Sequence, residues 1–200
     1  MPLTHLRALI HNLEVGASGD PVTGTSLSLK RSRDLLPCPS IGVGGIPRGA
    51  LIEVLGPART DWVVRFLSHN PLIQAAWIEE RFSLLPTALQ QRKVRLEQVI
   101  FVEAKENIEW TATTLLGSQL YGILVITGNW PANERSQKTL RRFQLFAERS
   151  NSSVFLLSEA PSSAWSISLQ LKAWRPSRLH PPEVKILRQR GLHASAMHPL

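Results

Sequence analysis

Residues 56–64, with the sequence GPARTDWVV, occupy the position that an α/β protein gives to a phosphate-binding loop. They follow the apolar run 50–55 and precede an amphipathic stretch. A nucleotide-binding loop reads G-x-x-x-x-G-K-[ST]: the second glycine lets backbone amides close on the phosphates, the lysine neutralises the β and γ phosphates, and the hydroxyl holds magnesium. Counted from Gly56, these three positions hold Asp61, Trp62 and Val63. The spacing of the loop is retained, but its chemical groups are replaced.

These replacements oppose nucleotide binding. Asp61 adds a negative charge beside a polyphosphate, and Trp62 offers bulk in place of an ammonium group. Arg59 could supply a cation, but one flexible arginine does not replace a closed cradle of amides. We therefore predict no catalytic residues, no cofactor and no metal ion. The vestigial phosphate loop comprises Gly56, Arg59, Asp61, Trp62 and Val63.

Two further positions test the same idea. The strand over 123–126 ends at Thr127, where a nucleotide site would need an aspartate to orient magnesium. The strand over 75–78 is followed by Glu79 and Glu80, where a water-activating glutamate could stand. We interpret both glutamates as ordinary acids at a strand end. A weak ATPase that uses Arg59 and Glu80 is the enzymatic alternative.

Positive charge is concentrated in the last third of the chain. The formal charge of +8 divides into +2, −1 and +7 over residues 1–60, 61–130 and 131–200. Contact with DNA phosphates or with an acidic partner is one interpretation of this charge, and a solvated helix face is the other. The candidate contact residues are Arg135, Lys138, Arg141, Arg142 and Arg149 in a predicted helix, and Lys185, Arg188 and Arg190 in a closing strand.

Apolar runs and helical periodicity alternate along the chain and predict an α/β fold with a mostly parallel sheet flanked by helices. The expected strands cover 50–55, 75–78, 99–102, 123–126 and 154–157, and the expected helices cover 61–69, 107–120 and 133–149. Residues 164–174 alternate between apolar and polar side chains, with Ser166, Ser168, Gln170 and Lys172 on the polar face. This pattern predicts a strand solvated on one side, which 183–191 would join as an antiparallel edge.

The expected domain runs from 35 to 191, after an N-terminal extension over 1–34 and before a flexible tail over 192–200. The extension combines a short amphipathic helix with a linker rich in glycine and serine. Cys38 is the single cysteine, so no internal disulfide can form, and no apolar run is long enough to span a bilayer. These features predict a cytoplasmic protein.

The tryptophans divide by their position in the pattern. Trp77 and Trp165 lie in apolar patterns, so we expect them in the core. Trp62, Trp130 and Trp174 lie near the ends of elements, where an exposed indole would be a candidate anchor for a partner.

Several motifs together resemble the RecA-type core of the ImuA proteins, which are bacterial accessory factors for mutagenic translesion synthesis. The motifs are GGIPRGALIEVLGP, the glutamates after 75–78, YGILVIT, RSQKTLRRFQLFAERSNSSVFLL and the closing EVKILRQRG. The resemblance covers residues 35–191 and none of its motifs is a catalytic signature. It implies a RecA-like three-layer core without ATPase chemistry.

The resemblance also implies a function in the SOS response to DNA damage. ImuA-type proteins act as adaptors that contact ImuB, which is related to Y-family polymerases, together with RecA and an error-prone polymerase α subunit. Direct contact with DNA, self-association and a location at the nucleoid are compatible with this role. The alternative is a SulA-like inhibitor of cell division that binds the tubulin-like division protein, because SulA is a smaller RecA-like relative without ATPase activity.

Overall fold

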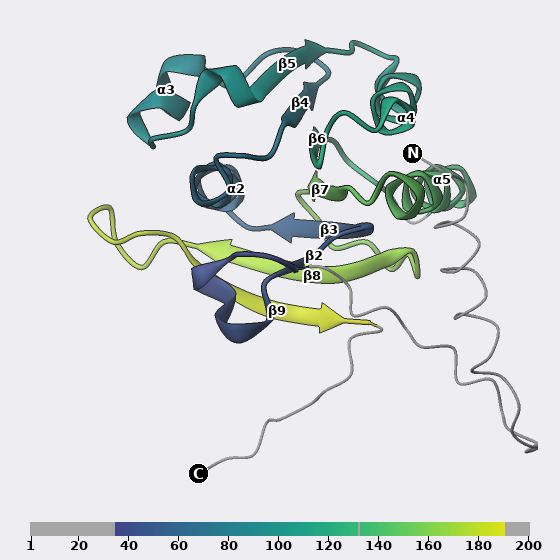
Figure 1. Ribbon diagram of the computed structural model, residues 1–200. Helices are drawn as coiled ribbons and strands as arrows, with labels where there is room; N and C mark the ends of the chain where they lie inside the picture. Colours follow the sequence, from purple (N-terminus) through teal and green to yellow (C-terminus); the bar gives the residue numbers. More distant parts are fainter. Residues whose placement is uncertain (1–34, 132, 191–200) are drawn as a thin grey trace, which may run out of the picture. The chain divides into compact units, whose positions relative to one another are not determined.

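The computed structural model of the chain describes residues 35–131 and 133–190 (Figure 1). The predicted extension over 1–34 and the tail over 192–200 lie outside these residues. The strands are β1 Leu35–Leu36, β2 Ile46–Pro47, β3 Ala50–Leu55, β4 Ala75–Glu79, β5 Val99–Glu103, β6 Ile123–Thr127, β7 Ser153–Leu157, β8 Ile167–Trp174 and β9 Glu183–Gln189. The α-helices are α2 Arg59–His69, α3 Pro86–Gln91, α4 Ile108–Ser118 and α5 Glu134–Ser150, and the short 3-10 helices are η1 Pro39–Gly44 and η2 Leu96–Gln98.

The centre of the domain is a seven-stranded sheet in the order β5-β4-β6-β7-β3-β8-β9. Neighbouring strands from β5 to β8 pair in parallel, and β9 pairs antiparallel with β8. This confirms the predicted α/β class with a mostly parallel sheet and an antiparallel edge. The antiparallel part is confined to β9, since β8 runs parallel to β3. The two-stranded β1–β2 pair and the helix α3 were not predicted.

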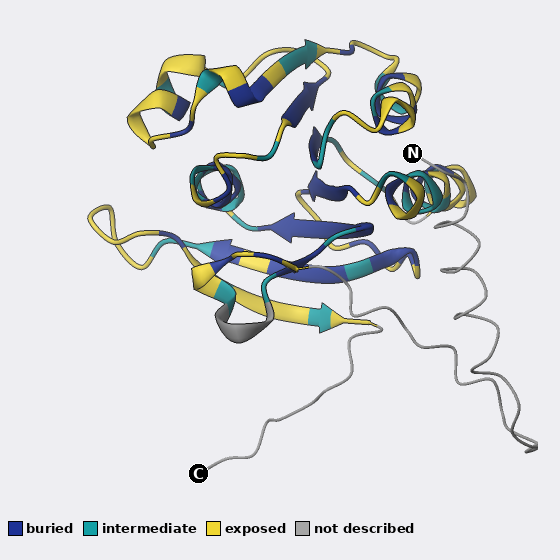
Figure 2. Ribbon diagram, in the orientation of Figure 1, coloured by how far each residue is buried: buried dark blue, intermediate teal, exposed yellow. Residues whose placement is uncertain are grey.

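Helices cover both faces of the sheet because its central strands are apolar on both sides (Figures 1 and 2). On one face, α2 and α3 pack over Ile52, Trp77 and Phe155. On the other face, α4 and α5 pack over Leu51 and Leu156. Within the two described ranges, no helix is long and apolar enough to cross a membrane.

The helix α5 follows directly from its sequence. Asn133 caps it by accepting a hydrogen bond from the Ser136 amide at 2.8 Å. Leu140, Phe143 and Ala147 are fully buried, as their spacing predicted. Asn151, in a left-handed conformation with φ of 53°, ends the helix just before β7.

The face assignments over 164–174 were partly wrong. Trp165, expected in the core, is 55% exposed, whereas Gln170, expected on the solvated face, is buried. Trp165 lies before the first residue of β8. Within β8, Leu51 pairs with Ile167 but Ile52 pairs with Leu169, so one extra residue places Ile167 and Leu169 on opposite faces of the sheet. Ser166 is also buried, while Lys172 is exposed as expected.

Gln170 is buried because it binds a buried acid. Glu53, in the middle of β3, accepts hydrogen bonds from the Ser162 amide at 3.1 Å and from Gln170 Nε2 at 2.6 Å. Gln170 Nε2 also donates to the Ser162 carbonyl oxygen at 2.6 Å. Burial raises the pKa of Glu53, against the opposing effects of these hydrogen bonds and of the nearby Arg188 charge. The network ties the loop after β7 to the sheet.

The substitution Glu53→Gln tests this buried carboxyl group through the pH dependence of stability. A carboxyl group with a raised pKa binds more protons in the folded protein than in the unfolded chain, so its contribution to stability falls with rising pH. The fall begins near the ordinary value of 4.5 and continues through the folded pKa. We expect urea unfolding to show a steeper loss of stability with pH for the parent than for Glu53→Gln. The control Glu97→Gln, whose side chain is 78% exposed in the parent, should follow the parent, and identical pH profiles for Glu53→Gln and parent would contradict the assignment.

Candidate functional site

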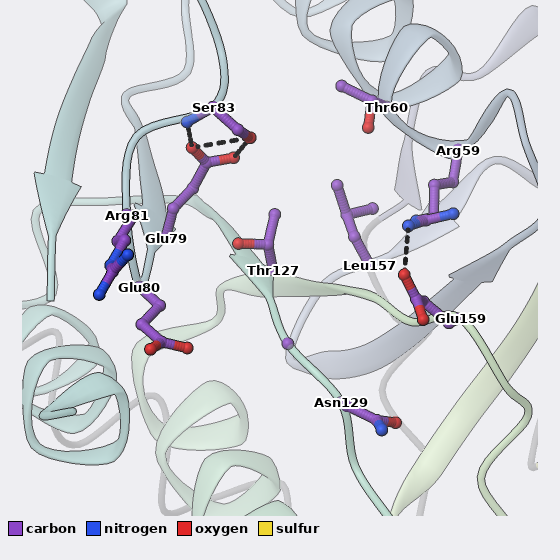
Figure 3. A pocket seen from close by; sticks show the side chains of 11 residues that line it. Arg59, Thr60, Glu79, Glu80, Arg81, Ser83, Thr127, Asn129, Leu157 and Glu159 are labelled. Carbon is purple, nitrogen blue, oxygen red and sulfur yellow. Dashed lines mark hydrogen bonds and ion pairs between the residues drawn. The ribbon is translucent and has the colours of Figure 1, made fainter. Parts of the chain in front are cut away.

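A crevice of 760 Å³ opens where β3, β4, β6 and β7 end (Figure 3). In open α/β sheets, ligands bind at this carboxyl edge of the strands. The first turn of α2 and the residues at or just after the ends of β4, β6 and β7 contribute polar side chains to its wall, among them Arg59, Thr60, Glu80, Thr127 and Glu159. This crevice is therefore the place to ask whether a nucleotide can bind.

The connection from β3 to α2 is too short to surround a phosphate chain. α2 begins at Arg59, so only residues 56–58 separate the strand from the helix. Gly56 has a φ of 93°, and a Cβ atom there would lie 2.3 Å from the carbonyl oxygen of Ala173 in β8. Glycine is required at this position by the close approach of the neighbouring strand, which is a structural reason.

Asp61 does not face the crevice. Its carboxylate binds Arg92 Nε at 2.8 Å, Arg175 Nη2 at 2.5 Å and Arg65 Nε at 3.4 Å. Arg92 caps α3 and Arg175 follows β8, so Asp61 connects α2 to two other parts of the domain. We had expected the Asp61 carboxylate to point into the phosphate site and to repel a polyphosphate. This was wrong, because the carboxylate points to these arginines.

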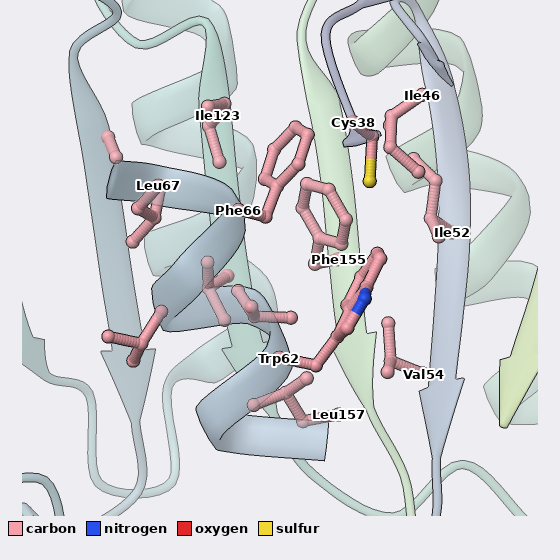
Figure 4. Close-up of a cluster of buried hydrophobic side chains, with 14 of the residues drawn as sticks. Cys38, Ile46, Ile52, Val54, Trp62, Phe66, Leu67, Ile123, Phe155 and Leu157 are labelled. Carbon is pink, nitrogen blue, oxygen red and sulfur yellow. The ribbon is translucent and has the colours of Figure 1, made fainter. Parts of the chain in front are cut away.

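Trp62 and Val63 face the hydrophobic core (Figure 4). The Trp62 side chain is buried, and its ring lies 6.2 Å from that of Phe66 and 6.4 Å from that of Phe155. The indole N–H donates to Ser40 Oγ at 2.9 Å, which satisfies its only polar atom. Trp62 is therefore a core residue and not the exposed interface anchor that its place near a helix end had suggested.

The remaining charged groups of the crevice partly neutralise one another. Arg59 donates to the Gly56 carbonyl oxygen at 3.2 Å and lies 3.7 Å from the Glu159 carboxylate. Glu80 is exposed and is directed into the crevice (Figure 3). The crevice is thus lined by two arginines: Arg59, which already has an acidic neighbour, and Arg81 from the turn after β4.

Glu79 and Thr127 form hydrogen bonds within the wall of the crevice. Glu79 is buried and accepts hydrogen bonds from Trp77 Nε1 at 3.0 Å and from the amides of Ser83 and Leu84 at 2.6 and 3.3 Å. Thr127 Oγ1 donates to the Ile78 carbonyl oxygen at 3.3 Å. Glu79 therefore shapes the turn after β4, which agrees with its interpretation as a structural acid at a strand end.

A cysteine or a cluster of metal-ligating side chains would be a further candidate site, apart from the crevice. Cys38 is buried, and burial raises the pKa of its thiol, which disfavours the thiolate that a nucleophile needs. Over residues 35–131 and 133–190, no cluster of three or more histidine, cysteine, aspartate or glutamate side chains could hold a metal ion.

The predicted basic residues divide between two surfaces. Arg135, Lys138, Arg142 and Arg149 share one side of α5, as expected from 3.6 residues per turn. Two of them have acidic partners: Lys138 Nζ lies 2.6 Å from Glu134, and Arg142 Nη1 lies 2.9 Å from Glu109 on α4. Half of this part of the basic set is therefore engaged in salt bridges on the helix surface.

Arg141, on another side of α5, belongs with the closing strand. Its guanidinium carbon lies 4.5 Å above the ring centroid of Trp165, while Arg188 Nη2 donates to the Ala164 carbonyl oxygen at 3.1 Å. α5 and β9 thus meet at residues 162–165. The sequence pattern missed Trp165 as a surface residue, although its position beside a run of serines and proline marked a loop.

Removing the Asp61 carboxylate should destabilise the domain. In Asp61→Asn, Arg92 and Arg175 lose their anionic partner, and hydrogen bonds to charged groups are worth about 1.5–3 kcal/mol each. We expect the free energy of unfolding in urea to fall by about 1–3 kcal/mol, less at high salt. Glu97→Gln is the matched control, because its exposed pair with Arg95 at 4.0 Å should contribute less than about 1 kcal/mol. Equal stability of Asp61→Asn and the control would contradict the structural role.

Comparison with known proteins adds no family to these observations. No protein-family model matches the chain, and no curated protein matches it at a significant level. Function must therefore be inferred from the crevice, the surface charge and the motifs.

Proposed function

We propose that this protein is a RecA-like domain without nucleotide chemistry that works as an adaptor in the SOS response, supporting error-prone translesion DNA synthesis. The partners proposed from its resemblance to ImuA proteins are ImuB, RecA and an error-prone polymerase α subunit. One observation carries the proposal, and it concerns the first turns of α2, which would hold the phosphates of a nucleotide. In these turns Trp62 packs in the hydrophobic core, and Asp61 forms salt bridges with Arg92 and Arg175.

The strand order supports the RecA-like part of the proposal. Renumbered from β3, the six parallel strands run 3-2-4-5-1-6, so β3 lies between β7 and β8. In the dinucleotide-binding fold the order is 3-2-1-4-5-6, and the first strand lies beside the second. The order therefore argues against a dinucleotide-binding fold, which is one alternative to a RecA-type core.

A weak ATPase is less well supported than an adaptor. Such an enzyme would use Arg59 as its cation and Glu80 to activate water. Arg59 lies beside Glu159 and donates to the loop carbonyl of Gly56, so its charge is partly offset before any phosphate arrives. The crevice retains a carboxylate but no amide cradle for the polyphosphate.

Exposed apolar side chains beside the crevice support a role in protein binding. Phe82 and Leu85, in the turn between β4 and α3, are 51% and 70% exposed. Large exposed apolar residues next to a cavity are typical of surfaces that bind a partner. We propose that a partner protein covers this rim, and that the protein acts in the bacterial cytoplasm, at the nucleoid when engaged.

Co-purification tests the proposal. Tagged parent protein, co-expressed with ImuB or with RecA, should retain each partner, and Phe82→Ala with Leu85→Ala should reduce recovery of at least one partner by tenfold or more. Alanine at Leu179, which is 97% exposed in the loop between β8 and β9, provides the control and should leave recovery unchanged.

The outcomes separate adaptor from division inhibitor. If neither ImuB nor RecA is retained by the parent protein, the adaptor proposal is wrong. If the parent instead blocks polymerisation of the tubulin-like division protein and causes filamentous growth on overexpression, the SulA-like alternative replaces it.

A further inference from the structure

The antiparallel edge of the sheet has a basic face on the side of α5. Gln170 pairs with Arg188, and Lys172 pairs with Lys185, and residues that pair directly across two strands point to the same side of a sheet. Gln170 is on the α5 side because its amide binds Glu53 there. Lys172, Lys185 and Arg188 therefore lie on one surface, which we call the β8–β9 face. Both lysines are exposed.

Further cations extend this face toward α5. Arg190 follows Arg188, and its amide donates to the Ser168 carbonyl oxygen at 2.8 Å. Burial, followed by the charge of Arg190, lowers the pKa of Arg188. Arg141 reaches the same region from α5. The register also places Glu183 on this face, at its far end opposite Trp174.

Trp165 lies where α5 and β9 meet. Its side chain is 55% exposed although Arg141 covers part of the ring at 4.5 Å. The backbone on either side is fixed: Ala164 is buried and accepts the hydrogen bond from Arg188, and Ser166 is buried as well. An aromatic ring is thus presented to solvent on a rigid support next to a row of cations.

We propose that the β8–β9 face, with Trp165 at its end, binds single-stranded nucleic acid. Proteins that bind single strands combine a cationic track for the phosphates with aromatic rings on which bases stack, and an arginine beside such a ring adds a cation–π contribution. Here the cations are Lys172, Lys185, Arg188 and Arg190, and the stacking ring is Trp165, supported by Arg141.

The arrangement favours single strands over duplexes. Phosphate contacts alone bind any polyanion, including duplex DNA. A base can stack on Trp165 only if it is not already stacked between its neighbours in a duplex. The inference is independent of the adaptor proposal, because binding through this face requires neither ImuB nor RecA.

Fluorescence anisotropy with the full chain tests the inference. The probe is a labelled oligodeoxythymidine of about 16 nucleotides, compared with a DNA duplex and with an oligouridine of the same length. We expect the single-stranded DNA to bind at least tenfold more tightly than the duplex at the same salt concentration. Comparison with the oligouridine shows whether DNA or RNA is preferred.

Trp165→Ala separates stacking from charge. Loss of a stacking ring should weaken binding about tenfold or more, and Trp165→Phe, which keeps a ring, should recover part of this loss. The control is Trp110→Ala, because Trp110 is 69% exposed on α4, away from the β8–β9 face, and its loss should leave binding unchanged. Circular dichroism would show that each variant is folded.

The dependence of binding on salt tests the cations. Each phosphate contact contributes a slope of about −0.7 to the logarithm of affinity against the logarithm of salt concentration for single strands. Lys172→Gln and Lys185→Gln should each reduce the slope by about 0.7. Arg95→Gln, at an exposed arginine before β5 on the opposite edge of the sheet, should not change it.

Three results would overturn the inference. They are the absence of single-strand binding by the parent at low salt, equal affinity for single strand and duplex, and unchanged binding by folded Trp165→Ala. Failure of this experiment would leave the co-purification results with ImuB and RecA unaffected.

Discussion

The burial of Trp62 is the constraint on which the rest of the site depends. Its indole packs against Phe66 and Phe155 and donates its N–H to Ser40, so the first turns of α2 are fixed against the sheet. Asp61 holds the same turns from the other side through Arg92 and Arg175. A helix start that is held by the core and by an arginine cluster cannot also present a lysine and a hydroxyl to a phosphate chain. We infer that side chains which would bind nucleotide in an ATPase here stabilise the fold.

The parallel sheet forms the framework of the domain and of its crevice. Its central strands are buried on both faces, where residues such as Trp77, Leu124 and Leu156 are fully buried. The crevice at the strand ends persists because the topology creates it. In its wall, Glu79 accepts a hydrogen bond from the turn after β4, and Arg59 forms a salt bridge with Glu159. Exposed residues lie at the rim of the crevice, where Phe82 and Leu85 are found, and on the β8–β9 face.

The sequence predicted the central strands and three of the helices, because buried parallel strands read as short apolar runs and α5 has a strong helical period. It did not predict the environment of Trp165 and Gln170, since Trp165 lies in the loop before β8 and Gln170 contacts Ser162 in the loop after β7, which no local pattern indicates. It did not predict the contacts that Asp61 and Trp62 make. Asp61 and Arg175 are separated by 114 positions in the chain, and no local pattern brings them together.

Titration calorimetry with ATP and magnesium tests the central claim most directly. If Trp62 and Asp61 stabilise the fold and do not bind a nucleotide, the full chain should show no magnesium-dependent heat of ATP binding. This corresponds to a dissociation constant weaker than about 1 mM. Arg59→Ala should behave like the parent, because Arg59 would have no phosphate to bind. Magnesium-dependent binding in the micromolar range that is lost in Arg59→Ala would contradict the account and would return the crevice to the class of nucleotide sites.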